Sequence, residues 1–350
     1  MKTQLKSYTP ELKLSYSKLA LGLEFKGCVT RSTSVWHWDI SPIEGRDGTI
    51  HLFLGEWEGD FSNWYKNARL AHYIADSPEG PFIFQEYTFT PDNLPGDYTS
   101  IYNARVKRID DIYVMVYSAA RYNGDDSYTL ENQATCIAYS HSLEGPWNFY
   151  GQDGTLIKKS NAFQNFSYKS CCGCVNACIE KIGNQYYVFF RAGKSRSGEM
   201  KYGYLTSDKL LSDYVLHDEA LTDNINYIED ADCLFYNGNE YLLTTDNTGG
   251  NSMGFSGDIN GRRTAPVGLL WQMKNGRFSL KNAQIGFGLL SDYVEDMSQA
   301  SCPPFGAYDK MERPAFLIQN GIPTYLYTCA YTSIEGTQKS QTYVFKINEF

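Results

Sequence analysis

The chain has 350 residues, of which 42% are hydrophobic, and a formal net charge of −9. That length allows one large domain or two small ones. The acidic balance lacks the basic footprint of a nucleic-acid-binding protein, and no segment approaches the roughly 20 apolar residues of a membrane span, so neither nucleic acid nor a membrane is expected as a partner.

The N-terminal 25 residues contain no continuous apolar region of about 7–15 residues and no clear signal-peptide cleavage site. The N-terminal sequence is compatible with two cellular locations. The protein is cytoplasmic, or it is secreted or periplasmic if a signal peptide was removed before residue 1.

Short segments rich in aromatic and β-branched residues recur along the chain, each bounded by Gly, Asn or Asp turns. They are IHLFLGEW (50–57), IYVMVYSAA (112–120), YYVFFRAG (186–193), EYLLTTD (240–246) and TYLYTCAY (324–331). Long segments with the 3.6-residue period of a helix are scarce. The pattern predicts an all-β fold.

These strands occur in a repeated setting. Each follows a turn, each turn follows another short strand, and a polar residue precedes that strand. The five polar residues are Asp39, Asn103, Asn176, Asp230 and Glu312. The motif S-x-E-G-P-[FW] also recurs, at 77–82 and 142–147. Five such units of about four strands predict a five-bladed β-propeller.

We expect residues 1–350 to form one propeller domain, because no linker is apparent. The fifth unit is short of strands, so the segment at about 14–27 is expected to complete the last blade and close the ring. The innermost strand of each blade starts near the axis, and the five polar residues should therefore converge on one funnel.

Several segments resemble a known group of enzymes. WDISPI followed by DGTIHLF, the turns SPEGPF and SLEGPW, and the blade starts IEDADCLFYNGNEYLL and MERPAFLIQNGIPTYLY are similar to glycoside hydrolase family 43 and its five-bladed relatives, including family 117. The likeness spans about residues 35–345. It implies a sugar-cleaving enzyme whose general base is the first-blade aspartate, Asp39.

The resemblance is incomplete at the other catalytic positions. This chain has Asn103 and Asn176 where family 43 carries an aspartate and a glutamate, so the family 43 machinery cannot be carried over whole. The family-117-like branch supplies acidic residues from its fourth and fifth blades, which fits this chain better. The acid is therefore expected among Asp230, Glu229 and Glu312.

The predicted function is glycoside hydrolysis of an oligosaccharide or polysaccharide, exo-acting and inverting, with one ionised and one protonated carboxyl group. Two alternatives are a non-catalytic carbohydrate-binding propeller and a glycoside phosphorylase or transferase, for which only Arg191, Arg313 and Arg121 could bind phosphate. Each acid also has a purely structural alternative. Asp39 would accept hydrogen bonds from backbone N–H groups at a strand start, and Glu312 would form a salt bridge.

The remaining candidates are side chains expected to bind substrate. They are His37, Trp38, Asn103, Asn176, Arg191, Asp246 and Arg313. The two arginines suit an acidic or sulfated sugar through bidentate contacts, but they equally suit a structural role, which we favour, of holding the funnel carboxylates in place.

No cofactor or catalytic metal is expected. The nine cysteines are odd in number, and the cluster SCCGCVNAC at 170–178 has no second Cys or His pair at zinc spacing, which favours reduced thiols. A structural calcium ion has only weak support, because NGDDSYTLE at 123–131 offers oxygen ligands without the spacing of a calcium loop.

Overall fold

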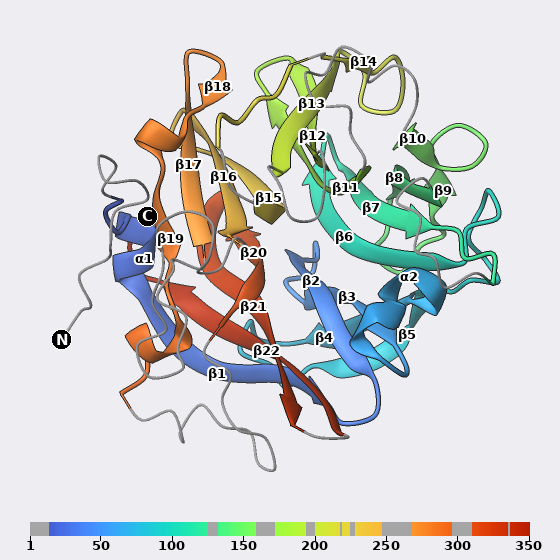
Figure 1. The fold of residues 1–350 in the computed structure, drawn as a ribbon, viewed down its shortest axis with the longest axis horizontal. Helices are drawn as coiled ribbons and strands as arrows, with labels where there is room; N and C mark the ends of the chain where they lie inside the picture. Colours follow the sequence, from blue (N-terminus) through green and yellow to red (C-terminus); the bar gives the residue numbers. More distant parts are fainter. Residues whose placement is uncertain are drawn as a thin grey trace.

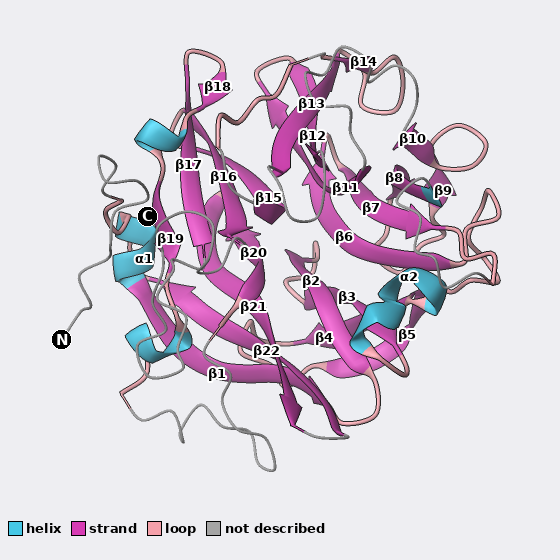
Figure 2. Ribbon diagram, in the orientation of Figure 1, coloured by secondary structure: helices cyan, strands magenta, loops and turns pink. Residues whose placement is uncertain are grey.

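The strands of the protein form five antiparallel sheets arranged around a central axis (Figures 1 and 2). The structure is a computed structural model. It describes residues 14–124, 132–158, 172–193, 200–217, 219–224, 228–246, 268–295, 310–334 and 337–350. The five-bladed β-propeller predicted from the sequence is confirmed.

Each sheet is one blade, and in the first three blades the strands follow one another in the chain from the axis outward. Blade 1 contains β2 (Trp36–Glu44), β3 (Ile50–Trp57), β4 (Arg69–Ala75) and β5 (Ile83–Phe89). Blade 2 contains β6 (Ser100–Ile109), β7 (Ile112–Ala120), β8 (Gln133–Ser140), β9 (Asn148–Phe149) and β10 (Thr155–Lys158). Blade 3 contains β11 (Cys172–Ile182), β12 (Gln185–Gly193), β13 (Met200–Ser207) and β14 (Val215–Leu216).

The last two blades differ in how they are completed. Blade 4 contains β15 (Ile228–Tyr236), β16 (Asn239–Asp246), β17 (Gly268–Lys274), β18 (Arg277–Phe278) and β19 (Gln284–Phe287). Blade 5 contains β20 (Glu312–Gln319), β21 (Ile322–Ile334), β22 (Thr337–Ile347) and β1 (Leu23–Ser32). The helical segments are short: α1 (Lys18–Gly22), α2 (Trp64–Asn67), η1 (Phe61–Asn63), η4 (Leu280–Asn282) and η5 (Leu290–Asp292). No helix among the described residues is long and apolar enough to span a membrane.

Five hydrophobic clusters hold the blades together, one between each pair of neighbours. Blades 1 and 2 share Phe53 and Tyr117, and blades 2 and 3 share Val116 and Phe190. The other three interfaces contain Phe189 with Trp271, Leu243 with Phe345, and Leu52 with Tyr327. Because the inner strands pack on both faces, their residues are buried almost without a break, as in β3. The fifth cluster joins blade 5 to blade 1 and so closes the wheel.

The first strand of the chain closes the last blade. β1 pairs antiparallel with β22, from Leu23 opposite Ile347 to Ser32 opposite Ser340, and Thr30 and Thr342 share a buried hydroxyl–hydroxyl hydrogen bond of 2.8 Å. The strand starts later than the segment expected at 14–27, whose middle is occupied by helix α1. Pairing between the two ends of the chain makes folding of this blade a long-range event.

A truncation tests how much stability this closure provides. Deleting residues 1–32 removes α1 and β1, exposes the edge of β22, and removes the buried leucines Leu19 and Leu23, each worth ~2–5 kcal/mol in a packed core. We expect an insoluble product or a strongly lowered Tm by differential scanning fluorimetry. A control that starts at residue 14 keeps both elements, and equal Tm values for the two truncations would contradict this role of β1.

Candidate functional site at the propeller axis

The inner strands of all five blades share one backbone irregularity. Each has a β-bulge at which one residue adopts left-handed backbone geometry, with φ between 50° and 62°. These five residues, called the ring positions here, are Asp39, Asn103, Asn176, Asp230 and Arg313. Asp and Asn tolerate this region better than other non-glycine residues, which explains why they occupy four of the five positions.

The fifth ring position differs from the one expected from the sequence. It holds Arg313, not Glu312, because the bulge in β20 falls one residue later than the polar pattern indicated. Hydrogen bonds confirm the equivalence, since the Asn176 N–H donates to Ser118 Oγ and the Arg313 N–H donates to Thr245 Oγ1, both on the preceding blade. A long side chain at φ 59° is strained, so its surroundings must hold it there.

Arg313 joins the two ring carboxylates. Its Nε lies 3.0 Å from Asp39 Oδ1, and its Nη1 forms an ion pair with Asp230 Oδ1. The ring asparagines complete the arrangement, because Asn103 Nδ2 donates to Asp39 Oδ1 at 2.6 Å and Asn176 Nδ2 donates to Asp230 Oδ1 at 2.5 Å. Side chains from all five blades thus meet in one buried network.

The other two acidic candidates lie directly before the ring positions and carry their own cations. Glu229 precedes Asp230 on β15 and forms an ion pair with Arg191 Nη1 at the end of β12. Glu312 precedes Arg313 and forms an ion pair with Lys310. Both arginines named from the sequence therefore contact carboxylates, as expected for groups that hold the funnel acids in place.

The two ring carboxylates differ in their electrostatic surroundings. Burial raises the pKa of Asp230 to about 8; Arg313 opposes this effect, and Glu229, Glu312 and Asp39 add to it. Burial also raises the pKa of Asp39, while Arg313 and the hydrogen bond from Asn103 act in the opposite direction. Among the described residues, the second oxygen of Asp230, Oδ2, is buried and has no hydrogen-bond partner. Asp230, with its pKa raised to about 8, is thus suited to carry a proton near neutral pH.

Three further candidates, His37, Trp38 and Asp246, are not ring residues. His37 Nε2 lies 3.2 Å from Glu56 Oε1, on β3. Trp38 is 2% exposed and meets Phe61 edge-on in the cluster between blades 1 and 5, so the structure places it in the core. Asp246 is buried at the end of β16, opposite the residue before Glu229 in the register of β15.

Sequence reasoning missed a buried cation below the ring. Arg105 lies two residues after Asn103 on β6, is 5% exposed, and donates to main-chain carbonyl groups of other blades. No residue pattern marks it, because the β-bulge at Asn103 interrupts the alternation of β6 and because its partners are main-chain carbonyl groups. Arg121, considered for phosphate binding, instead donates to the Gly96 carbonyl and lies over Tyr98.

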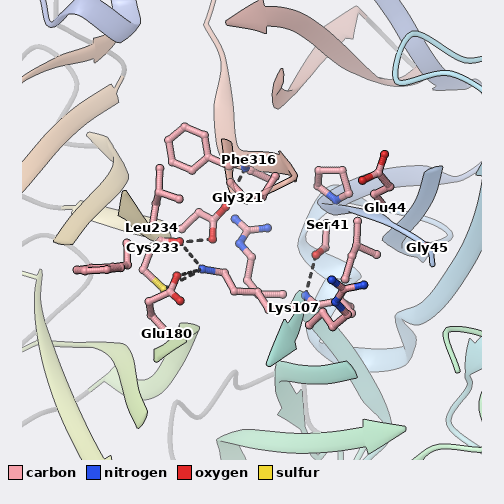
Figure 3. A pocket seen from close by; sticks show the side chains of 18 of the residues that line it. Ser41, Glu44, Gly45, Lys107, Glu180, Cys233, Leu234, Phe316 and Gly321 are labelled. Atoms are coloured by element: carbon pink, nitrogen blue, oxygen red, sulfur yellow. Dashed lines mark hydrogen bonds and ion pairs between the residues drawn. The ribbon is translucent and has the colours of Figure 1, made fainter. Parts of the chain in front are cut away.

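A cavity of about 600 Å³ lies at the opposite end of the inner strands, near the hairpin turns. Figure 3 shows Lys107 at its wall, contacting Glu180 and Cys233, with Ser41 and Phe316 nearby. Arg105 also lines this cavity. The Arg105 side chain therefore lies between the ring and this cavity at the hairpin end.

The described part of the chain contains no cluster of three or more His, Cys, Asp or Glu residues that could hold a metal ion. In the 170–178 segment, Cys174 and Cys178 are buried on β11, and burial raises the pKa of both thiols. The stretch considered for calcium falls mainly within residues 125–131, outside the described residues.

Comparisons with known proteins agree with the architecture. No family model and no curated protein matches the sequence. Among solved structures, the chain is similar to Zg3597, a family 117 glycoside hydrolase of Zobellia galactanivorans, with a TM-score of 0.62 and 10% identity over 95% of this chain and 92% of that one.

Two further solved structures are similar over most of their length. The arabinanase Arb43A of Bacillus subtilis has a TM-score of 0.55 and 13% identity over 92% of this chain and 96% of that one. The catalytic domain of the Coprinopsis cinerea GH62 α-L-arabinofuranosidase has a TM-score of 0.57 and 10% identity over 95% and 98%. The chain has the five-bladed fold of these glycoside hydrolases, which confirms the resemblance predicted from the sequence.

The raised pKa of Asp230 makes stability depend on pH with a definite sign. The native state binds the Asp230 proton more tightly than the unfolded chain does, so this stabilisation is complete below about pH 4 and is lost as the pH rises through about 8. Asp230→Asn removes the effect. The free energy of unfolding of the variant, relative to the wild type, should therefore increase from pH 4 to 8 by up to ~1 kcal/mol per pH unit. The Tm of the variant minus that of the wild type should increase with it.

Calorimetry or thermal fluorimetry across that range provides the measurement. Asp92→Asn removes an exposed carboxylate and is the matched control, for which the difference should stay flat. A flat difference for Asp230→Asn as well would show that Asp230 is not a proton-binding group of the native state.

Proposed function

We propose that the protein is a glycoside hydrolase whose reaction takes place at the ring positions. Asp39 acts as general base toward a water molecule, and Asp230 acts as general acid toward the leaving oxygen. The observation that carries the proposal is the pair of buried carboxyl groups at the axis, one of which has a strongly raised pKa. Each is held by Arg313 and by a ring asparagine. The pKa of Asp230 is raised to about 8, and its Oδ2 is buried without a hydrogen bond in the described structure.

Asp230 is a better acid than its two rivals. All three acids contact a cation: Arg313 for Asp230, Arg191 for Glu229 and Lys310 for Glu312. The ion pairs therefore do not distinguish them. A general acid must hold a proton near neutral pH. The surroundings of Asp230 supply that condition through burial and the surrounding carboxylates.

We propose an inverting mechanism. Retaining enzymes bring their carboxyl groups to about 5–5.5 Å so that one can attack the sugar, whereas inverting enzymes keep them about 6.5–9.5 Å apart to admit a water molecule. We propose exo action on a terminal residue of an oligosaccharide or polysaccharide, to be tested by product analysis.

The substrate panel follows from the similar structures. Their names include an arabinanase and an α-L-arabinofuranosidase, so arabinan, arabino-oligosaccharides and aryl arabinofuranosides stand first. Algal and other plant oligosaccharides complete the panel.

A non-catalytic carbohydrate-binding propeller is the second candidate. It is favoured by the asparagines at the second and third ring positions and by the cation beside each described funnel acid. Binding of an oligosaccharide by calorimetry, with no product after prolonged incubation, would identify this function.

Leaving-group dependence separates the two catalytic roles. Asp39→Asn should lower kcat/KM by about 10²–10⁴ on every substrate, because the base is needed each time. Asp230→Asn should cause a similar loss on oligosaccharides but a much smaller one on a dinitrophenyl glycoside, whose leaving group needs little protonation. Glu312→Gln is the comparison variant, and a larger leaving-group effect there than in Asp230→Asn would assign the acid to Glu312.

The pH profile of kcat/KM provides an independent test. An acid with a pKa of about 8 is protonated at neutral pH and loses its proton above it, so hydrolysis should decline above pH ~8. This basic limb should disappear in Asp230→Asn when the residual activity on a dinitrophenyl glycoside is followed. A limb that persists unchanged in the variant would belong to another group.

A further inference from the structure

Arg105 occupies the axis directly below the ring. Its Nη1 donates to the Ile40 carbonyl at 2.5 Å, and its Nη2 donates to the Pro314 carbonyl at 3.0 Å and to the Asp230 carbonyl at 3.5 Å. Its Nε donates to the Ala231 carbonyl at 3.4 Å. All these acceptors are main-chain oxygens, so one side chain of blade 2 is bonded to the backbones of blades 1, 4 and 5.

These carbonyl groups belong to the ring itself. Ile40, Ala231 and Pro314 directly follow the ring positions Asp39, Asp230 and Arg313. Each bonded carbonyl therefore lies at a left-handed bulge that aims a ring side chain. Fixing three of the five bulges from one guanidinium sets how the Asp39, Asp230 and Arg313 side chains stand relative to one another.

The charge of Arg105 also acts on the ring. Asp39 faces two cations, Arg313 of β20 and Arg105 of β6, which favour its ionised form, and the carboxyl groups of Glu229 and Asp230 on β15, which oppose it. The Cys329 thiol of β21 and the amide of Asn103 complete its surroundings. Unlike Arg313, Arg105 has only carbonyl partners among its hydrogen bonds in the described chain, so its charge is not matched by a contacting carboxylate.

We propose that Arg105 is the positioning residue of the site: through main-chain carbonyl groups of three blades it holds Asp39 and Asp230 in register, and its charge favours the ionised form of Asp39. The inference rests on the proposed function for its catalytic consequence. The organisation of the ring by Arg105 is testable without a substrate.

Lys107 supplies a matched control. It lies two residues further along β6, is largely buried, and contacts Glu180 Oε2 at 2.7 Å and the Cys233 carbonyl. It is another axial cation bonded to two other blades, but it lies on the hairpin side of Arg105, at the cavity wall. Lys107→Met therefore removes a buried charge and interblade contacts without touching the ring.

The experiment compares Arg105→Met, Arg105→Lys and Lys107→Met with the wild type. Protein labelled with ¹³C at the aspartate carboxyl carbon is titrated by NMR, and the Asp39 signal is assigned by its loss in Asp39→Asn. Arg105→Met should raise the apparent pKa of Asp39 by about one unit, the low end for a nearby charge. Arg105→Lys and Lys107→Met should leave it within about 0.3 unit.

The kinetic arm uses the acid limb of kcat/KM, which should move upward in Arg105→Met by the same amount. Arg105→Lys keeps the charge but loses the fork of donors, so kcat should fall about 10-fold with KM little changed. Lys107→Met should lower Tm and move neither quantity. If Arg105→Met does not fold, the kcat of Arg105→Lys decides.

The outcomes separate the two proposals. An unchanged Asp39 titration in folded Arg105→Met, an equal shift in Lys107→Met, or a wild-type kcat in Arg105→Lys would overturn the role of Arg105. Failure of the wild type to hydrolyse any glycoside would overturn the proposed function alone, because the NMR titration still reports whether Arg105 controls Asp39.

Discussion

Burial of charge on the propeller axis is the constraint on which the site depends. A carboxylate or guanidinium removed from water is tolerated only when opposite charges and hydrogen-bond donors replace its hydration. In this protein the replacements come from other blades. Asp39 of blade 1 needs Asn103 of blade 2 and Arg313 of blade 5, and Asp230 of blade 4 needs Asn176 and the same arginine. Because neither ring aspartate is satisfied within its own blade, the site exists only when the wheel is closed.

The five bulges determine which side chains reach the axis of the closed propeller. A regular strand would direct successive side chains to the two faces of a blade, toward its neighbours. The left-handed residue in each bulge instead turns one side chain out of this alternation, and the five meet on the axis. Placing an arginine in such a strained position is costly, and its double ion pair offsets the cost. The same network surrounds both aspartates, and it leaves Asp230, which also faces Glu229, Glu312 and Asp39, with a pKa raised to about 8.

The sequence predicted the blades well and the ring nearly so. Four of the five ring residues follow from the regular spacing between polar residues and the apolar strands after them. Glu312 was taken for the fifth because an acidic residue continued the pattern, and the bulge in β20 shifts the position by one. Trp38 was expected at the funnel from its neighbours in sequence, yet it packs against Phe61. The role of Arg105 could not be predicted, because its partners are main-chain carbonyl groups. Every residue has such a group, so the sequence does not indicate which ones it contacts.

Local chemistry therefore decided how many sheets the chain builds and which residues begin each inner strand, since alternation, turn residues and repeat spacing are properties of neighbouring residues. Pairing of Arg191 with Glu229, the sharing of Arg313 by two aspartates, and the raised pKa of Asp230 were decided only by the tertiary structure. The physical reason is that desolvation and Coulomb interactions depend on distances between blades, and closure alone sets those distances.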